Sequence, residues 1–306
     1  MSISLVISTY NRSKKLKECL DSVKDIADEI VVVDNSSEDD SVSVAKKYTK
    51  NVFIRPNNPM LNVNKNFGFG KASKEWILYL DDDEKLTEDL KAELKNLKES
   101  LDKNSDISGY WIPRKNMIFG KWIQHGIWWP DYQMRLFKNG KGKYEEKHVH
   151  EMIKVDGPTE RLKSPLEHEN YTSISQYLYK LDKFYTENEA ERILESGKNL
   201  EWFEALKMPV GDFLKTFFLQ EGYKDGLHGL VLSILQAFYS EIVFVKVWEK
   251  RGFKEYNSNN FINDVFYQMK IIVKEFNYWF LTVFINETKN PIKRLILKIN
   301  RKKQII

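Results

Sequence analysis

The stretch Trp76-Ile77-Leu78-Tyr79-Leu80-Asp81-Asp82-Asp83-Glu84 joins an apolar run of strand length to four consecutive acidic residues. Unpaired carboxylates are costly to bury, so acids at the end of a buried strand need a compensating cation. Mg2+ and Mn2+ prefer oxygen ligands and often bridge a carboxylate to a substrate diphosphate. The stretch therefore predicts a metal and diphosphate site. A solvated loop that opens a helix at Thr87-Glu88-Asp89 is the alternative.

Two earlier segments repeat this arrangement. An apolar strand at 3–7 ends in polar residues 8–12, and an amphipathic helix follows with Leu16, Cys19, Leu20 and Val23 on one face. A second strand at 29–33 ends at Asp34, before a short helix from about 39 to 48. Continuous β-branched runs that alternate with helices indicate a parallel sheet covered on both faces. Because ligands bind beyond the carboxyl ends of such strands, we expect Thr9 and Arg12, Asp34 and Asp81 to Asp83 at one edge.

These segments resemble the nucleotide-sugar half of the family 2 glycosyltransferases, which are inverting enzymes. Four motifs carry the resemblance: S-x-x-I-S-T-Y-N-R, V-V-V-D-N-S-S-E-D, N-x-N-x-G-x-G-K-A-S from Asn64 to Ser73, and L-D-D-D-E. The resemblance implies an α/β protein with a GT-A (Rossmann-like) fold, a mostly parallel sheet flanked by helices. A C-terminal helical extension is expected beyond it.

The resemblance also implies roles for individual residues. The metal motif maps to Asp81 and Asp83, with Asp83 touching Mg2+ or Mn2+ directly. Asp34 would read the nucleotide base. The other expected contacts of the nucleotide sugar are Thr9, Tyr10, Arg12, Asn66, Lys71, Asp81 and Arg135. The family often has a small residue at the position of Asp82, which we expect to be spare or outward-facing.

An inverting transfer needs a carboxylate that takes the proton from the acceptor hydroxyl. The resemblance places Glu151 in this role, with His150 beside it to orient it or to reach a phosphate. Asp131, just before the strand at 131–138, is the competing candidate and an alternative acceptor-binding acid. His168 is placed to complete the metal shell, or to act as a capping or surface residue.

Length predicts one catalytic domain with an appendage. We expect a catalytic domain at 1–170, with a nucleotide-sugar half at about 1–105 and an acceptor half at about 106–170, and a helical extension at 171–306. The lone Cys19 is expected in the core of a protein from a reducing compartment. No signal peptide is visible, which predicts a cytoplasmic location.

The C-terminal tail is strongly cationic. From Lys289 onward the chain has seven basic residues and no acid, so the other 288 residues carry a net charge of -3 within the total of +4. Apolar residues intersperse with these basic residues, and the apolar run at 276–285 is too short to span a bilayer. The pattern predicts a helix on the inner face of the cell membrane. A solvated basic helix or a nucleic-acid contact is the alternative, although no nucleic-acid-binding signature is present.

Beyond residue 100 the resemblance narrows to the lipopolysaccharide-core β-1,4-glucosyltransferase subgroup, through the motifs at 135–151, 166–171 and 222–239. That subgroup implies a UDP-hexose donor, UDP-glucose, and a glycolipid or other saccharide acceptor. Aromatic residues between 109 and 130 are either a saccharide platform or core. A polyisoprenyl-phosphate glycosyltransferase is an alternative, as is a non-catalytic saccharide-binding membrane scaffold. A sugar nucleotidyltransferase would open with a Gly-rich loop, and Ser8 to Arg12 contains no Gly.

Overall fold

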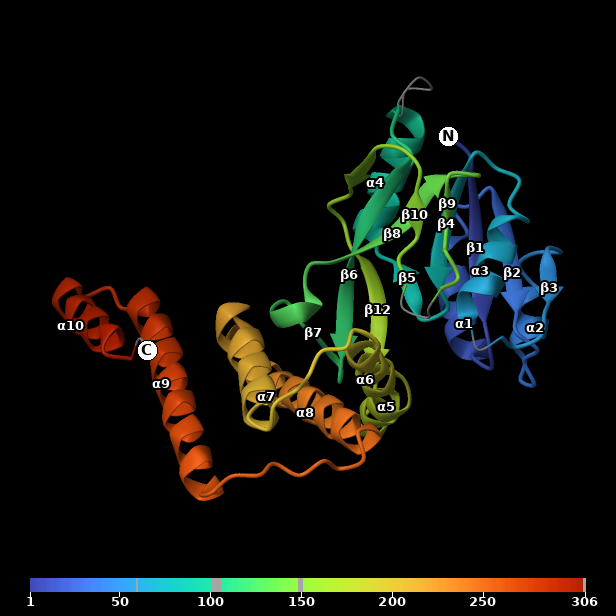
Figure 1. The fold of residues 1–306 in the computed structure, drawn as a ribbon. Coiled ribbons are helices and arrows are strands. Elements are labelled where there is room, and N and C mark those ends of the chain that lie inside the picture. The colour runs from blue at the N-terminus through green and yellow to red at the C-terminus, as the bar shows by residue number, and fades with distance from the viewer. Residues whose placement is uncertain (59, 101–105, 148–150, 305–306) are drawn as a thin grey trace. The chain divides into compact units, whose positions relative to one another are not determined.

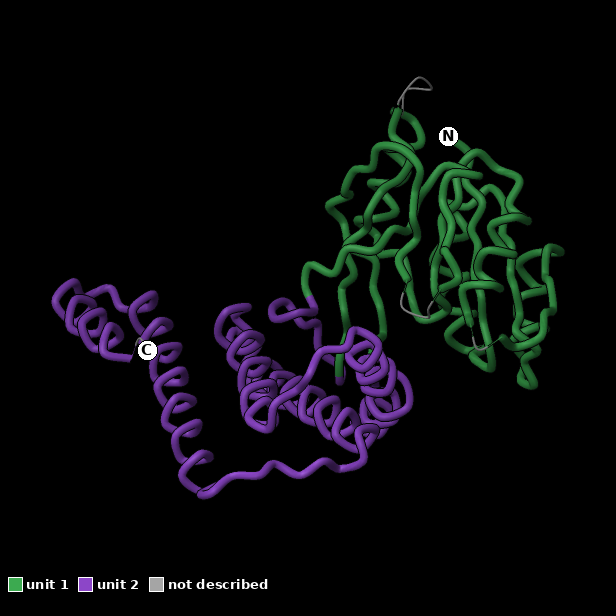
Figure 2. The backbone as a smooth tube through the Cα atoms, viewed as in Figure 1, with its two compact units in different colours: residues 1–118, 129–170 green, residues 119–128, 171–306 purple. Residues whose placement is uncertain are grey.

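A computed structural model describes residues 1–58, 60–100, 106–147 and 151–304 of the chain. The chain forms two compact units, which Figure 2 distinguishes by colour. Unit 1 contains Met1–Ile118 and Trp129–Asn170, and unit 2 contains Phe119–Trp128 and Tyr171–Ile306. Each unit is described by itself.

Unit 1 is built on a sheet whose path runs β3-β2-β1-β4-β8-β6-β12-β5 (Figure 1). Its strands are β1 (Ile3–Thr9), β2 (Glu29–Asp34), β3 (Val52–Ile54), β4 (Trp76–Asp81), β5 (Glu84–Leu86), β6 (Gly109–Ile118), β8 (Asp131–Lys138), β11 (Thr159–Arg161) and β12 (Leu166–Tyr171), with a separate ribbon of β9 (Gly142–Lys143) and β10 (Lys154–Val155). Neighbours from β3 to β4 are parallel, and β8 is antiparallel to β4 and β6.

Helices cover both faces of this sheet. Alternate strand residues point to opposite sides, and both sets are apolar, so each face needs a covering layer. The helices of unit 1 are α1 (Ser13–Val23), α2 (Ser41–Ala45), α3 (Leu61–Phe69) and α4 (Glu88–Ser100). Leu5 and Ile7 pack in a core with residues of α1 and α4, including the buried Cys19. Val6 packs in a second core that includes Phe69 of α3. The α/β architecture predicted from the sequence is confirmed.

A glycine sets how closely α3 lies on the sheet. A Cβ atom on Gly68 would come within 2.7 Å of Val6 Cγ1 and 3.0 Å of Val33 Cγ2. Real Cβ atoms essentially never make a contact as short as the first, so only glycine fits here without a shift of α3. This explains the glycine in the N-x-N-x-G motif. It also fixes where the N-terminal turn of α3 lies relative to the ends of β1 and β2.

Unit 2 is mainly helical. Its elements are β7 (Lys121–Trp122), η1 (Gly126–Trp128), α5 (Ile174–Lys180), the π-helix η2 (Leu181–Tyr185), α6 (Thr186–Glu195), α7 (Glu204–Leu214), the π-helix η3 (Lys215–Leu219), η4 (Gly222–Asp225), α8 (Leu227–Lys250), α9 (Phe261–Glu287) and α10 (Pro291–Lys302). Helices α5, η2 and α6 form one continuous helical segment from Ile174 to Glu195, with the π-helical turns in its middle. Helix α8 is long and apolar enough to cross a membrane, and 28% of its apolar window is buried.

Candidate active site

Three parallel strands of unit 1 end at the same edge of the sheet. Thr9 at the end of β1 is in register with Asp34 at the end of β2. On the other side of β1, Ser8 is in register with Asp81 at the end of β4. The structure therefore brings together Thr9, Asp34 and the acidic run that begins at Asp81. The cluster formed by Asp81, Asp82, Asp83 and Glu84 is called the acid cluster below.

Asp81 is held between two cations. Its Oδ1 lies 3.0 Å from Lys65 Nζ and accepts a hydrogen bond from the Tyr79 hydroxyl, and its Oδ2 lies 2.6 Å from an Arg135 nitrogen. Burial works to raise the pKa of Asp81, but Lys65 and Arg135 outweigh it and hold this pKa well below its usual range. Asp81 is therefore ionised, and the chain's own cations neutralise it.

Asp82 is buried, so the expectation of a spare, outward-facing acid is wrong. Its carboxylate accepts a hydrogen bond of 2.7 Å from the Thr9 hydroxyl and one of 3.1 Å from Arg12. Burial, together with the negative charges of Asp83 and Asp81, raises the pKa of Asp82 to about 6 despite the attraction of Arg12. A small residue at this position would remove the hydrogen bond that joins Thr9, at the end of β1, to the residue after β4.

Arg12 joins Asp82 to Asp83. The same guanidinium nitrogen lies 3.1 Å from Asp82 Oδ1 and 2.8 Å from Asp83 Oδ2. Burial works against ionisation of Asp83, yet His168 and Arg12 lower the pKa of this carboxyl group. One oxygen of Asp83 is thus committed to Arg12, and the other faces His168.

The orientation of His168 follows from a chain of side chains. Asn116 donates through Nδ2 to Asp131 Oδ2 at 3.2 Å, so its Oδ1 faces His168 Nδ1 at 2.7 Å. Because Asn116 Oδ1 only accepts, His168 Nδ1 carries the proton. Burial lowers the pKa of His168 to about 4. The ring is neutral near pH 7, and its Nε2 presents a lone pair to Asp83 Oδ1, 3.7 Å away.

This pair suits a divalent cation. Two lone-pair atoms that face each other without a hydrogen between them repel, and a cation placed between them removes the repulsion. At 3.7 Å, His168 Nε2 and Asp83 Oδ1 are too far apart for a direct hydrogen bond, so both lone pairs are available to a cation. A hydrogen bond that fixes the other ring nitrogen, as from His168 to Asn116, is usual for metal-binding histidines. Asp83 and His168 therefore fit such a site.

Asp81 does not join them as a third ligand in this structure. Both of its oxygens are engaged by Lys65, Tyr79 and Arg135. Within the described ranges, no group of three His, Cys, Asp or Glu side chains is arranged to hold a metal ion. Mg2+ is commonly bound by one or two protein ligands together with water and substrate phosphates, and two ligands satisfy that pattern.

Sequence reasoning gave no individual role to three residues of this site. Glu84 is fully buried and lies 2.8 Å from Arg135, with Arg114 at 3.6 Å. Lys65 stands between the two asparagines of the N-x-N motif, a position that signals its proximity to Asp81. Arg114 has no such signal, because only the pairing of β6 with β8 brings it opposite Asp131.

Glu151 is anchored near the N-terminal turn of α3. Its carboxylate accepts hydrogen bonds from the backbone N–H groups of Glu146 at 2.8 Å and Lys147 at 2.5 Å, and from the side chain of Asn62 at 3.3 Å. Asn62 is one turn before Lys65 on α3, and Lys65 reaches Asp81. The structure thus ties Glu151 to the acid cluster through α3. His150 lies outside the described residues.

Asn66 fastens the segment that leads to Glu151. Its Nδ2 donates to the Tyr144 carbonyl at 2.9 Å and to Glu146 at 2.7 Å, and its Oδ1 accepts from the Tyr144 N–H at 2.9 Å. These contacts hold Asn66 in place beside the segment that leads to Glu151.

Three side chains hold Asp131. It binds Arg114 through Nε at 2.7 Å and also contacts Gln133 at 2.7 Å and Asn116 at 3.2 Å. Burial works to raise the pKa of Asp131, but Arg114, Asn116 and Gln133 lower it. A carboxylate that is ion-paired with an arginine and has a lowered pKa is a poor base.

The remaining predicted contacts differ in how they are placed. Asp34 is fully buried; its Oδ1 accepts from the Ser37 N–H at 2.8 Å, and its Oδ2 has no hydrogen-bond partner among the described residues. Tyr10 is 42% exposed just beyond β1. Lys71 follows the C-terminal end of α3 and lies over the rings of Phe53 and Phe67, so the structure does not bring it to the acid cluster.

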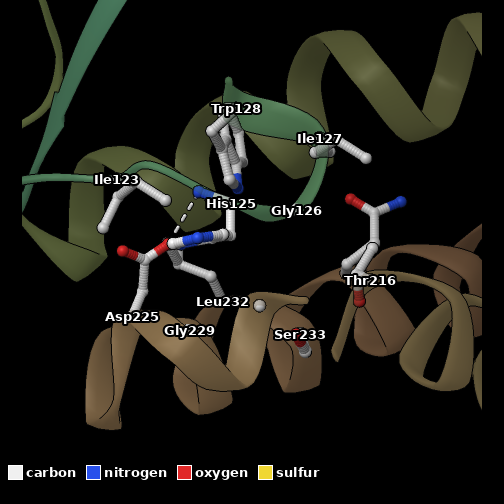
Figure 3. Close-up of a pocket in the computed structure, with 12 residues that line it drawn as sticks. Ile123, His125, Gly126, Ile127, Trp128, Thr216, Asp225, Gly229, Leu232 and Ser233 are labelled. Atoms are coloured by element: carbon white, nitrogen blue, oxygen red, sulfur yellow. Dashed lines mark hydrogen bonds and ion pairs between the residues drawn. The ribbon is translucent and has the colours of Figure 1, made fainter. Parts of the chain in front are cut away.

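Unit 2 has a small cavity of its own, which Figure 3 shows. The buried Asp225 accepts hydrogen bonds from the backbone N–H groups of His125 at 2.9 Å and Gln124 at 3.1 Å. The cavity behind this contact measures about 10 Å3, which is room for about one water molecule. These contacts fasten the segment 119–128 to η4 and α8, and the cavity is too small for a sugar.

Comparison with known proteins agrees with this geometry. The profile of the family "Glycosyl transferase family 2" matches residues 4–154, which contain the strand ends and the acid cluster. An uncharacterized glycosyltransferase of Rickettsia prowazekii is 29% identical over 273 residues, which are 85% of this chain and 92% of the relative. The lipopolysaccharide core biosynthesis glycosyltransferase LpsC of Rhizobium meliloti is 25% identical over 261 residues, 83% of this chain and 94% of the relative. The crystal structure of S. aureus TarS 1–349 superposes with a TM-score of 0.38 at 16% identity, covering 84% of this chain and 93% of that one.

A parallel sheet that gathers paired carboxylates at its carboxyl edge, combined with these sequence relatives, defines a glycosyltransferase. The chain belongs to family 2 of these enzymes, through residues 4–154. The recognition made from the four sequence motifs is thereby confirmed, and the chain is an enzyme of the transferase class.

Proposed function

We propose that this protein transfers a hexose, glucose, from a UDP-sugar to a saccharide of the lipopolysaccharide core or another surface glycan, with inversion and with a divalent metal. The observation that carries the proposal is the convergence of Thr9, Asp34 and the acid cluster at one edge of the sheet. The kinship with LpsC, a lipopolysaccharide core biosynthesis enzyme by name, supports the acceptor class.

Asp34 is suited to recognise the base. Its buried Oδ2, which lacks a partner among the residues described, is an acceptor that an imide N–H of uracil would satisfy. A buried acceptor built for a donor rejects ligands without that donor, because the carboxylate is then left unpaired. We assign Asp34 to uracil recognition on this ground.

Asp83 and His168 would hold the metal ion, which when bound supplies positive charge to the leaving diphosphate. Arg12 and Lys65 lie beside the same edge and carry fixed positive charge toward it. As the acceptor oxygen attacks the anomeric carbon, the bond from that carbon to the diphosphate oxygen breaks, and its electrons leave with UDP. The opposite side of the carbon is attacked, so the configuration inverts.

Glu151 is assigned as the base that takes the proton from the attacking hydroxyl. Its competitor Asp131 is ion-paired with Arg114, which lowers the pKa of Asp131 against the effect of burial. We therefore assign Asp131 as a positioning residue that acts through Asn116 on His168.

Titration calorimetry with UDP, with and without Mn2+, tests the site. We expect metal-dependent binding that Asp83→Ala abolishes and that Asp89→Asn, an exposed carboxylate on α4, leaves unchanged. If the affinity for UDP is the same with and without Mn2+, and the same in wild type and Asp83→Ala, the metal assignment is wrong.

Transfer assays test the base. Glu151→Gln should bind UDP normally and lose transfer by a factor of roughly 100 to 10,000. A Glu151→Gln enzyme that turns over at the normal rate would exclude Glu151 from proton transfer. Comparison of UDP-glucose with other UDP-sugars in the same assay identifies the donor.

A further inference from the structure

Helix α10 exposes an apolar stripe to its surroundings. Ile292, Leu295, Ile296 and Ile299 are 72%, 59%, 53% and 51% exposed. Their spacing of three and four residues places them on one side of the helix. An isolated exposed Ile or Leu is ordinary, but four on one side of a single helix form a surface that favours a partner.

This stripe is not the side by which α10 packs on α9. Figure 1 shows α10 running back beside α9. Leu297 is only partly exposed, and Arg301 contacts α9 through Thr282 Oγ1 at 3.3 Å and the ring of Tyr278 at 5.3 Å. Leu297 and Arg301 lie on another side of the helical wheel from the exposed stripe, because they are not in its register.

Helix α9 has a similar stripe. Four apolar residues in the first half of α9 recur at intervals of three or four residues, and each is at least 43% exposed: Ile262, Phe266, Met269 and Val273. This spacing keeps them on one side of the helix. Farther along the helix, Phe280 packs on the ring of Phe218 in η3, with centroids 4.8 Å apart.

Basic residues surround the stripe of α10. Lys293, Lys298 and Lys302 are exposed on this helix beside the stripe, and the chain has no acidic residue from Lys289 to its end. A helix with an apolar side, basic flanks and no acid is the pattern of helices that lie in the interface of an anionic bilayer. Nucleic acid would pair with the basic residues but would leave the apolar stripe in water.

We propose that α9 and α10 form a docking surface for an anionic lipid bilayer. The apolar stripes enter the boundary between headgroups and acyl chains, while the lysines and arginines meet the lipid phosphates. This inference is independent of the sugar-transfer chemistry, because binding to lipid needs neither donor nor acceptor.

Sedimentation of the full chain with vesicles tests the charge contribution. We expect binding to phosphatidylcholine vesicles that contain phosphatidylglycerol and much weaker binding to pure phosphatidylcholine. The triple variant K293Q/K298Q/K302Q should bind the anionic vesicles roughly 100-fold more weakly. The control K46Q/K47Q/K50Q removes three exposed lysines of unit 1 and should bind normally.

Single substitutions test the apolar contribution. Ile296→Ser should weaken binding to anionic vesicles roughly tenfold. Ile54→Ser is the matched control, since Ile54 is 60% exposed in unit 1, and it should have no effect. Circular dichroism of each variant verifies that it is folded.

Three results would overturn the proposal. Equal binding to neutral and anionic vesicles would remove the role of charge. Equal losses in the test and control variants would remove the role of α10. Light scattering that shows a dimer of the wild type and a monomer of Ile296→Ser, with vesicle binding unchanged, would assign the stripe to a second copy of this chain.

Discussion

Replacement of Arg135 by Met should destabilise unit 1 strongly. Arg135 is 4% exposed and lies 2.6 Å from Asp81 and 2.8 Å from Glu84, so its removal leaves the buried Glu84 and the half-buried Asp81 short of a cation. Removal of one partner of a buried ion pair typically costs about 3–5 kcal/mol. The stability of a natural domain is only about 5–15 kcal/mol, so the free energy of unfolding should fall by about a fifth or more.

The structure also predicts which of the two carboxylates contributes more to the loss of stability. Asp81 keeps Lys65 at 3.0 Å after the substitution, whereas the nearest cation left to Glu84 is Arg114 at 3.6 Å. Neutralising Glu84 should therefore recover more stability than neutralising Asp81. We expect R135M/E84Q to regain at least about 2 kcal/mol over R135M, and R135M/D81N to regain less.

Hydrogen exchange measured on peptides of β4 and β8 is the appropriate assay. It reports the opening free energy of unit 1 alone, whereas global unfolding of a chain with two units need not be two-state. A loss below about 1 kcal/mol in R135M, or equal recovery in the two double variants, would refute this account of how the acid cluster is neutralised.

Four further predictions concern the other contacts. Asp131→Asn should weaken metal binding roughly 10- to 100-fold, so that excess Mn2+ restores transfer; a loss that excess Mn2+ does not restore would return Asp131 to the role of base. The pKa of Asp82 is raised, so the folded chain binds more protons than the unfolded chain between about pH 4 and pH 6, and the stability of the wild type falls as pH rises through that window. In the presence of chelator, the stability of Asp82→Asn relative to wild type should therefore increase by about 2 kcal/mol from pH 4 to pH 7. If urea titrations give the same stability difference between the two proteins at both pH values, this account is wrong. Gly229→Ala should destabilise unit 2 by about 1–3 kcal/mol or more, because the added Cβ would lie 1.7 Å from the Gly222 carbonyl oxygen. The control Gly211→Ala, on α7, has open space around its Cβ and should be neutral or stabilising, and thermal melts compare the two variants. Chelation of divalent metal should abolish transfer but leave the melting temperature of unit 1 within a few degrees, since Arg12, Lys65 and Arg135 already pair the acids; unfolding in chelator would contradict this.

The sheet edge could be predicted from the sequence because parallel strands impose a simple rule. Each strand carries a continuous apolar run that ends where polar residues begin, and parallel strands bring those ends to one edge. This is why Thr9, Asp34 and Asp81 were placed together before the structure was known. Cys19 was placed in the core by the same apolar periodicity, and it is buried there.

The strand rule alone does not supply the partners of the acids. Arg135 and His168 are suggested only by the family resemblance, and nothing in the sequence suggests Arg114. All three come from strands that follow the acidic run by roughly 30 to 85 residues, and only the antiparallel pairing of β8, β6 and β12 in the sheet brings them near it. Asp82 was misjudged for the same reason, since its contact with Thr9 depends on how β1 and β4 lie side by side. The small residue that the family often has at this position suggested an exposed side chain, whereas Asp82 is buried and accepts a hydrogen bond from Thr9.

The salt bridge of Arg12 to Asp83 has a consequence for how ready the site is before a ligand binds. The guanidinium holds Oδ2 of Asp83, and Oδ1 is left facing His168. Because one oxygen is held, the carboxylate cannot rotate freely, and the other oxygen keeps its direction. The edge of the sheet is therefore preorganised, and little ordering of Asp83 remains to oppose binding.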